Sequence, residues 1–339
     1  MAPRRRRAAL FAIKLAVTLG LLAWLVHQIL AKEGIDALVH RLSVLRWEWI
    51  AAAVALHLTA VLAGVVRWHT LLRAGEIDLP LPWLLRSFLV GRFVGAFTPS
   101  TAGLDGWRVY EVSRQTGRTA QSAAVIAVEK LVGLLGMAAV CGALVPFGAR
   151  RLLGDGAIVS TVSIAAGASI VLLALGRPSW MRRLAARLPF ARSRALSVAE
   201  ALERTRPTPG ALARALALGA VSHLALSAVF LATARALGVD ASAGTMLVTG
   251  NAIVVAVLLP ISIGGVGVRE GVAVMLLASA GVAPADAMLV ALLGYVTGQV
   301  PALAGGLLLV AKRAAASSVH SPAEPSLAEP ALAPAEQTG

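Results

Sequence analysis

The chain has 339 residues, of which 58% are hydrophobic and only 14% are charged. A soluble fold is excluded, because a soluble surface of this size needs far more charge. The net charge of +14 does not indicate nucleic acid, since Lys and Arg gather at the ends of apolar runs. One cysteine excludes an intrachain disulfide, and six scattered histidines offer no metal-ligand spacing, so we expect neither metal nor cofactor.

The first apolar run, 9–30, follows four consecutive arginines. It is longer than the apolar part of a signal peptide, so we interpret it as a retained span with a cytoplasmic N-terminus. Further helices are predicted at 49–67, 120–148, 156–176, 210–237, 241–259 and 284–310, several of them long enough to cross a bilayer. We expect an all-α polytopic protein of the cell membrane, with about 7–8 transmembrane helices in one integral membrane domain, 1–312.

Two further apolar segments, 83–98 and 268–281, are short or charged. Segment 83–98 carries Arg86 and Arg92, and a full span would cost roughly 2.5–3.5 kcal/mol for each of them. We therefore predict a re-entrant or interfacial half-helix at 83–98, because irregular backbone at membrane depth survives only inside protein or beside water. Segment 268–281 either spans or re-enters.

Two polar stretches complete the chain. The connection 177–208 holds eight arginines and two glutamates, which predicts a cytoplasmic loop. It is either a solvated loop or an amphipathic helix on the headgroups. The tail, 313–339, is rich in Ala, Pro, Ser and Glu, and we expect it to be disordered.

Two segments interrupted by proline and glycine share one spacing. Offsets 0, 4 and 9 are Pro99, Gly103 and Arg108 in the first segment, and Pro260, Gly264 and Arg269 in the second. Acids stand nearby, namely Asp105 and Glu111 in the first segment and Glu270 in the second. The match raises the question of an internal repeat, and interrupted segments in corresponding halves point to the substrate site of a transporter.

A helix that stops inside a membrane leaves backbone N–H groups that favour an anion. Arg108 and Arg269 add charge and a fork of donors that fits phosphate. The alternative is that both segments are ordinary cytoplasmic loops whose arginines only fix topology. The predicted substrate-binding residues are Asp105, Arg108, Glu129, Gly264, Gly265, Arg269 and Glu270.

Glu129 and Lys130 lie about ten residues into a predicted span. They are either functional groups facing a wet interior or an interfacial acid with a snorkelling lysine. Because neighbours on a helix point about 100° apart, we do not expect both to face one partner. Tyr295 and Gln299 share a helix face and line the same cavity or bond to another helix, and we interpret His223 as a packed residue.

Four stretches together resemble a known family: "RWHTLLRAG", "FVGAFTPSTAGLDGWRVYEVSRQTGR", "AVEKLVG" and "PISIGGVGVREG". They are similar to the transmembrane region of lysylphosphatidylglycerol synthase, a flippase-like family that also occurs as stand-alone membrane proteins. The resemblance covers roughly residues 10 to 312. Leu104 stands where the family's first motif has a second glycine, and Lys130 stands where the family has arginine.

The resemblance implies movement of an anionic phospholipid or a lipid-linked envelope precursor between leaflets. The soluble domain that performs aminoacyl transfer in the full-length synthases has no expected counterpart in the tail. The alternatives are an intramembrane enzyme acting on lipid phosphates and an accessory scaffold. We find no convergent acid–base or metal set near the motifs, so we expect no enzyme activity. The expected partners are lipids with anionic headgroups, while a homo-oligomer or an envelope-enzyme partner is left open.

Overall fold

The computed structural model describes residues 43–96, 102–175, 207–258 and 265–319, together with a few single positions at 27, 39–40, 98, 200, 204–205 and 262. Almost all of the predicted first span and of the 177–208 connection lies outside the described residues. So do Pro99, Pro260 and Gly264, and the end of the chain from residue 320.

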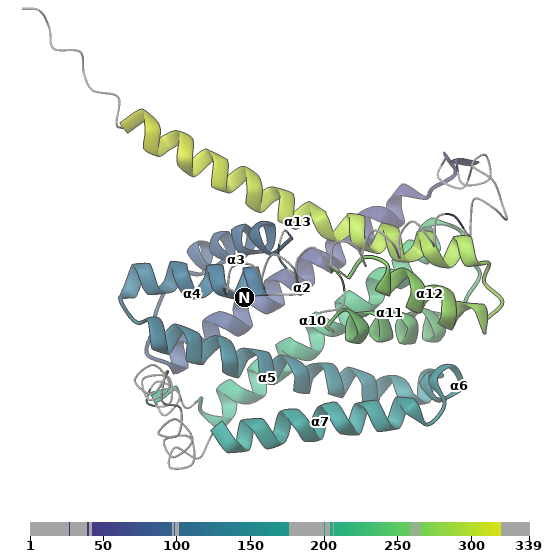
Figure 1. Cartoon of the computed structure of the whole chain (residues 1–339), viewed down its shortest axis with the longest axis horizontal. Coiled ribbons are helices and arrows are strands. Elements are labelled where there is room, and N and C mark those ends of the chain that lie inside the picture. The colour runs from purple at the N-terminus through teal and green to yellow at the C-terminus, as the bar shows by residue number, and fades with distance from the viewer. Residues whose placement is uncertain are drawn as a thin grey trace, which may run out of the picture.

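The described residues form an all-helical protein, with no strand in any of these ranges (Figure 1). The helices are α2 (Trp47–Ala74), α3 (Leu81–Ala96), α4 (Ala102–Thr116), α5 (Thr119–Leu144), η1 (Val145–Phe147), α6 (Ala149–Leu153), α7 (Gly156–Leu175), α10 (Pro209–Ala236), α11 (Ala243–Val257), α12 (Val268–Ala278) and α13 (Pro284–Val319). The predicted all-α class is confirmed. α13 continues past residue 312, where the sequence predicted the start of the tail.

Among the described residues, four helices are long and apolar enough to cross a membrane: α2, α5 with η1, α10, and α13 as far as Ala311. They correspond to four of the predicted spans, and the chain is a membrane protein. α11 is apolar but has only 15 residues. The total of 7–8 spans and the re-entrant character of 83–98 and 268–281 stay predictions.

The same order of helix lengths, long, short, short, long, occurs twice along the described chain. α2 and α5, with 28 and 26 residues, enclose the short pair α3 and α4. α10 and α13, with 28 and 36 residues, enclose the short pair α11 and α12. In each half the two short helices pack against each other, while α2 lies along α10. α13 crosses both α3 and α12, so it joins the halves (Figure 1).

Glycine allows the short helices of the first half to pack closely. A Cβ on Gly91 would come within 2.8 Å of Leu104 Cδ1, and one on Gly95 would meet the Leu104 backbone nitrogen at 3.2 Å. Leu104, the departure from the family pattern, thus fills the contact between α3 and α4. The N–H of Gly103 donates to Thr98 Oγ1 at 3.0 Å, and this bond holds the start of α4 against the end of α3.

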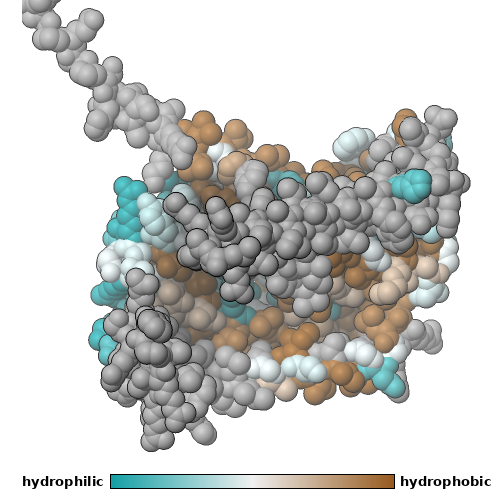
Figure 2. All heavy atoms as spheres, viewed as in Figure 1, coloured by the Kyte–Doolittle hydropathy of each residue, from teal (hydrophilic) through white to brown (hydrophobic). Residues whose placement is uncertain are grey.

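The surface of the described residues agrees with a membrane setting. Large apolar side chains are exposed along α13, among them Leu303, Leu307 and Val310. Figure 2 shows apolar residues spread over the visible flank of the protein, with the hydrophilic residues towards its ends. In water such an area would drive association, whereas in a bilayer it contacts hydrocarbon.

Candidate functional site: two buried arginine clusters

The first cluster consists of Arg67, Asp105, Arg108, Glu129 and Lys130, contributed by α2, α4 and α5. Glu129 lies at its centre and is buried. Its Oε1 accepts hydrogen bonds from Nη2 and Nε of Arg67 at 3.1 and 3.3 Å. Its Oε2 accepts from Nη2 of Arg108. One carboxylate therefore bridges two guanidinium groups.

Lys130, the neighbour of Glu129, has a different partner. Its Nζ lies 2.6 Å from Asp105 Oδ2, and Asp105 Oδ1 lies 3.8 Å from Arg108 Nη1. Glu129 and Lys130 therefore both contact α4, but through different residues that stand almost one turn apart.

Aromatic rings cover the guanidinium of Arg108. Its Cζ lies 4.2 Å from the centroid of the Trp68 ring and 5.1 Å from that of Phe88. Arg108 is only 3% exposed. Stacking of this kind holds a guanidinium by its faces and leaves its edge for oxygen ligands. The cluster has three cations and two anions, so one positive charge is left over.

The second cluster consists of His57, Arg92, Arg269, Glu270 and Tyr295. Arg269 is 6% exposed, and its Cζ lies 4.1 Å from the centroid of the Tyr295 ring. Its Nε lies 3.4 Å from Oε1 of Glu270, the next residue in the chain. Here too, an arginine from an interrupted segment is buried against an aromatic ring and beside a carboxylate.

Glu270 also caps the start of α12. Its Oε2 accepts a hydrogen bond from the N–H of Gly267 at 2.6 Å, which caps the helix. Gly265 and Gly267 have φ values of 76° and 85°, a conformation that favours glycine. A Cβ on Gly265 would also lie 2.6 Å from Cγ2 of Val257. The structure thus gives Gly265 a role in shaping the turn, while Gly264 lies outside the described residues.

His57 and Arg92 attach the second cluster to α13. His57 Nε2 lies 3.0 Å from the carbonyl oxygen of Gly294, and Arg92 Nη2 donates to that of Gly298 at 3.2 Å. Gly298 permits this approach, because a Cβ there would lie 2.9 Å from His57 Cε1. Neither His57 nor Arg92 was predicted as a site residue. The paired glycines one turn apart on α13 are the signal that could have found them.

Two helices pass through both clusters. α2 carries His57 in one and Arg67 in the other, which sets them about 15 Å apart along the helix axis. α3 carries Phe88 beside Arg108 and, one turn later, Arg92. The predicted residues Asp105, Arg108 and Glu129 come together in the first cluster, and Arg269 and Glu270 in the second. Arg67 was not among the predicted site residues.

The remaining candidates do not add a chemical centre. Gln299 Nε2 donates to the carbonyl oxygen of Tyr295 within α13, at 3.2 Å. Across the part of the chain that the structure describes, no three His, Cys, Asp or Glu side chains gather where they could hold a metal ion. What both clusters present is a buried guanidinium group beside an aromatic ring, a group whose donors suit an anion.

Comparison with known proteins agrees with the motifs. The family model of the lysylphosphatidylglycerol synthase transmembrane region matches residues 11–306. No curated protein matches the chain. The matched range includes every residue of both clusters and well over half of the 339 residues. The chain therefore belongs to the family of the lysylphosphatidylglycerol synthase transmembrane region, and is a membrane protein tied to lipid or envelope biogenesis.

Proposed function

We propose that this protein is a non-enzymatic transporter that moves an anionic phospholipid, or a lipid-linked envelope precursor, between the leaflets of the cell membrane. One observation carries the proposal. Arg108 and Arg269 occupy the same offset in two interrupted segments, and each is buried against an aromatic ring and beside a carboxylate. We also propose a cytoplasmic N-terminus, as the charge distribution predicts.

The first cluster is suited to exchange one anion for another. A phosphate oxygen that replaces Glu129 on Arg108 does not leave the carboxylate alone, because Glu129 keeps its two bonds to Arg67. A buried charge without a partner is expensive, so this retained pair lowers the barrier to exchange. The single surplus positive charge of the cluster also matches the single negative charge of a phosphodiester.

The two clusters provide two successive binding positions for a headgroup on its way across the membrane. The hydrocarbon core of a bilayer is about 30 Å thick, and the clusters lie about 15 Å apart along α2. A headgroup that passes from one to the other is never far from a guanidinium while its tails stay in lipid. The repeated order of long and short helices supports this view, since repeat interfaces are where transporters place their substrates.

Transport of labelled lipid in vesicles tests the proposal. The purified protein is reconstituted with fluorescent phosphatidylglycerol or, for comparison, zwitterionic phosphatidylcholine, and the outer leaflet is bleached with dithionite. We expect faster movement of phosphatidylglycerol, lost in Arg108→Gln and Arg269→Gln. Arg114→Gln is the matched control, because Arg114 is an exposed arginine on α4.

Three results would point elsewhere. Normal movement in both Arg108→Gln and Arg269→Gln contradicts the site. A new lipid product detected by mass spectrometry in the same vesicles supports the alternative of an intramembrane enzyme. Neither movement nor product supports an accessory scaffold that works with an envelope enzyme or with further copies of itself.

A further inference from the structure

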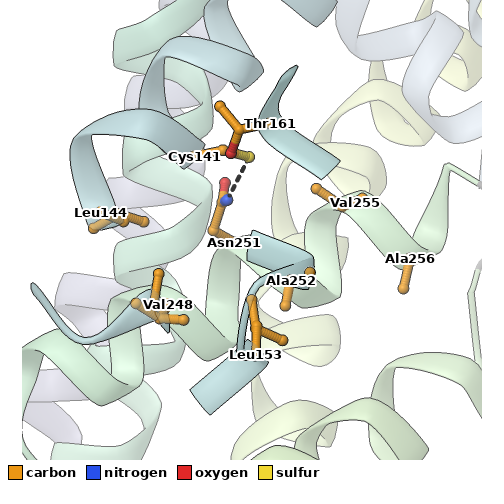
Figure 3. A pocket seen from close by; sticks show the side chains of 11 residues that line it. Cys141, Leu144, Leu153, Thr161, Val248, Asn251, Ala252, Val255 and Ala256 are labelled. Atoms are coloured by element: carbon orange, nitrogen blue, oxygen red, sulfur yellow. Dashed lines mark hydrogen bonds between the residues drawn. The ribbon is translucent and has the colours of Figure 1, made fainter. Parts of the chain in front are cut away.

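A cavity of about 390 Å³ lies between α5, α7 and α11, and no residue of the two clusters lines it. Its volume is within the range of small-molecule sites. Most of its wall is aliphatic, including Leu144, Val248 and Val255, and none of the lining residues that the structure describes carries a charge (Figure 3). The wall therefore suits a neutral, mainly apolar occupant.

One polar side chain interrupts this apolar wall. Asn251 of α11 is 6% exposed, and its Nδ2 donates to Cys141 Sγ at 2.9 Å. Its Oδ1 is buried and has no hydrogen-bond partner within the described part of the chain. Figure 3 shows the amide lying between α11 and α5, close to Thr161. A buried amide oxygen without a donor is unfavourable, so its position calls for a ligand that donates.

We infer that this cavity binds the hydrocarbon chain of a neutral membrane lipid, and that Asn251 Oδ1 accepts a hydrogen bond from a hydroxyl group near the root of that chain. The aliphatic wall receives the chain, and the missing donor is supplied by the hydroxyl. An anionic headgroup is disfavoured in the cavity itself, since none of the described lining residues would neutralise it. The site is independent of the two arginine clusters, so it can be tested without measuring transport.

Cys141 makes the test direct, because it lines the cavity and is the only cysteine of the chain. The detergent-solubilised protein is labelled with N-ethylmaleimide in the presence of 1-dodecanol or of dodecane, which lacks the hydroxyl. We expect dodecanol to protect Cys141 at about fivefold lower concentration than dodecane, the difference supplied by one net hydrogen bond of ~1 kcal/mol. The unfolding temperature, which needs no reaction at Cys141, should rise with the same preference.

Substitutions at two positions separate recognition of the hydroxyl group from general shielding of Cys141. Asn251→Leu removes the acceptor at similar volume and should erase the preference for the alcohol. Ala252→Trp fills the cavity and should abolish protection by both compounds, with Ala252→Leu as a milder version if the tryptophan variant does not fold. Leu307→Cys in a Cys141→Ala background is the control, because Leu307 is 73% exposed on α13 and should be labelled at a rate that dodecanol does not change.

Equal protection by dodecanol and dodecane in the wild-type protein would overturn the role of Asn251. Protection that persists in both Ala252→Trp and Ala252→Leu would overturn the cavity as the binding site. The inference requires two results. Asn251→Leu should still be protected, but equally by both compounds, and the two Ala252 variants should lose protection by either compound.

Discussion

The two clusters each pair a buried arginine with a carboxylate, but they do so in different ways. Arg108 takes its carboxylate from another helix, and that carboxylate also serves Arg67. Arg269 takes its carboxylate from the next residue, which also caps α12. In the first arrangement, Arg108 can leave Glu129 without leaving that carboxylate unpaired, because Arg67 still binds it. The second ties the arginine to the start of its own helix. Equivalent positions in the two halves thus combine a cluster that can exchange partners with one that is fixed in place.

The largest effect is expected from Glu129→Leu. This change leaves Arg67 and Arg108 buried without their shared anion, and breaking a buried pair costs roughly 3–5 kcal/mol. We expect a strongly lowered unfolding temperature in detergent and low yield. Glu48→Gln, at an exposed position in the first turn of α2, is the matched control and should behave as wild type. Wild-type stability of Glu129→Leu would show that the two arginines have other anions.

A smaller effect is expected from Gly298→Ala, which tests how firmly the second cluster is held. The added methyl would lie 2.9 Å from His57 Cε1, so either the histidine or α13 must shift. Overpacking of this kind costs about 1–3 kcal/mol. The unfolding temperature should fall, whereas Gly271→Ala, at a glycine of α12 with open space around it, should cause little change. Equal effects of the two substitutions would mean that the cluster relaxes freely.

Next in size is the effect of Arg269→Lys on transport. Lysine keeps the charge but loses the fork of donors and much of the stacking on Tyr295. A cation–π contact is worth about 0.5–2 kcal/mol, so we expect movement of phosphatidylglycerol to fall by roughly two- to thirtyfold. Membrane orientation, measured on the same vesicles, should stay unchanged. Unchanged movement in Arg269→Lys, together with altered orientation in Arg269→Gln, would favour a purely topological role.

The smallest effect is expected in the comparison of Glu270→Gln with Glu270→Ala. Glutamine keeps an oxygen that can accept from the N–H of Gly267, so the cap persists, and the two variants should differ in stability by about 1 kcal/mol. Loss of the charge next to Arg269 should still lower transport. Glu270→Ala, which removes the cap as well, should be clearly less stable than Glu270→Gln. Similar stability of the two variants would mean that Glu270 does not stabilise α12 by capping it, and would weaken the contrast between the clusters.

Local pattern was enough to predict part of this site. The shared offsets identified Arg108 and Arg269, and the acid inside a predicted span identified Glu129. Arg67 was not predicted as a site residue, because an arginine at the end of an apolar run has the same local pattern whether it faces headgroups or a buried carboxylate. His57 and Arg92 become site residues only through α13, whose glycines are distant in the sequence. The spacing of Gly294 and Gly298 marks α13 as a site of close approach, but it does not say which residues of other helices approach it.

The length of α13 has a consequence for the outer shape of the protein. Its 36 residues rise about 54 Å, whereas the hydrocarbon core is about 30 Å thick. Tilt alone would have to reach about 56° to hide the difference, which is beyond the range of 0–40° seen for membrane helices. The helix therefore extends beyond the hydrocarbon core while still helical, into the headgroup region or past it. A fluorophore attached at its far end would report from outside the hydrocarbon.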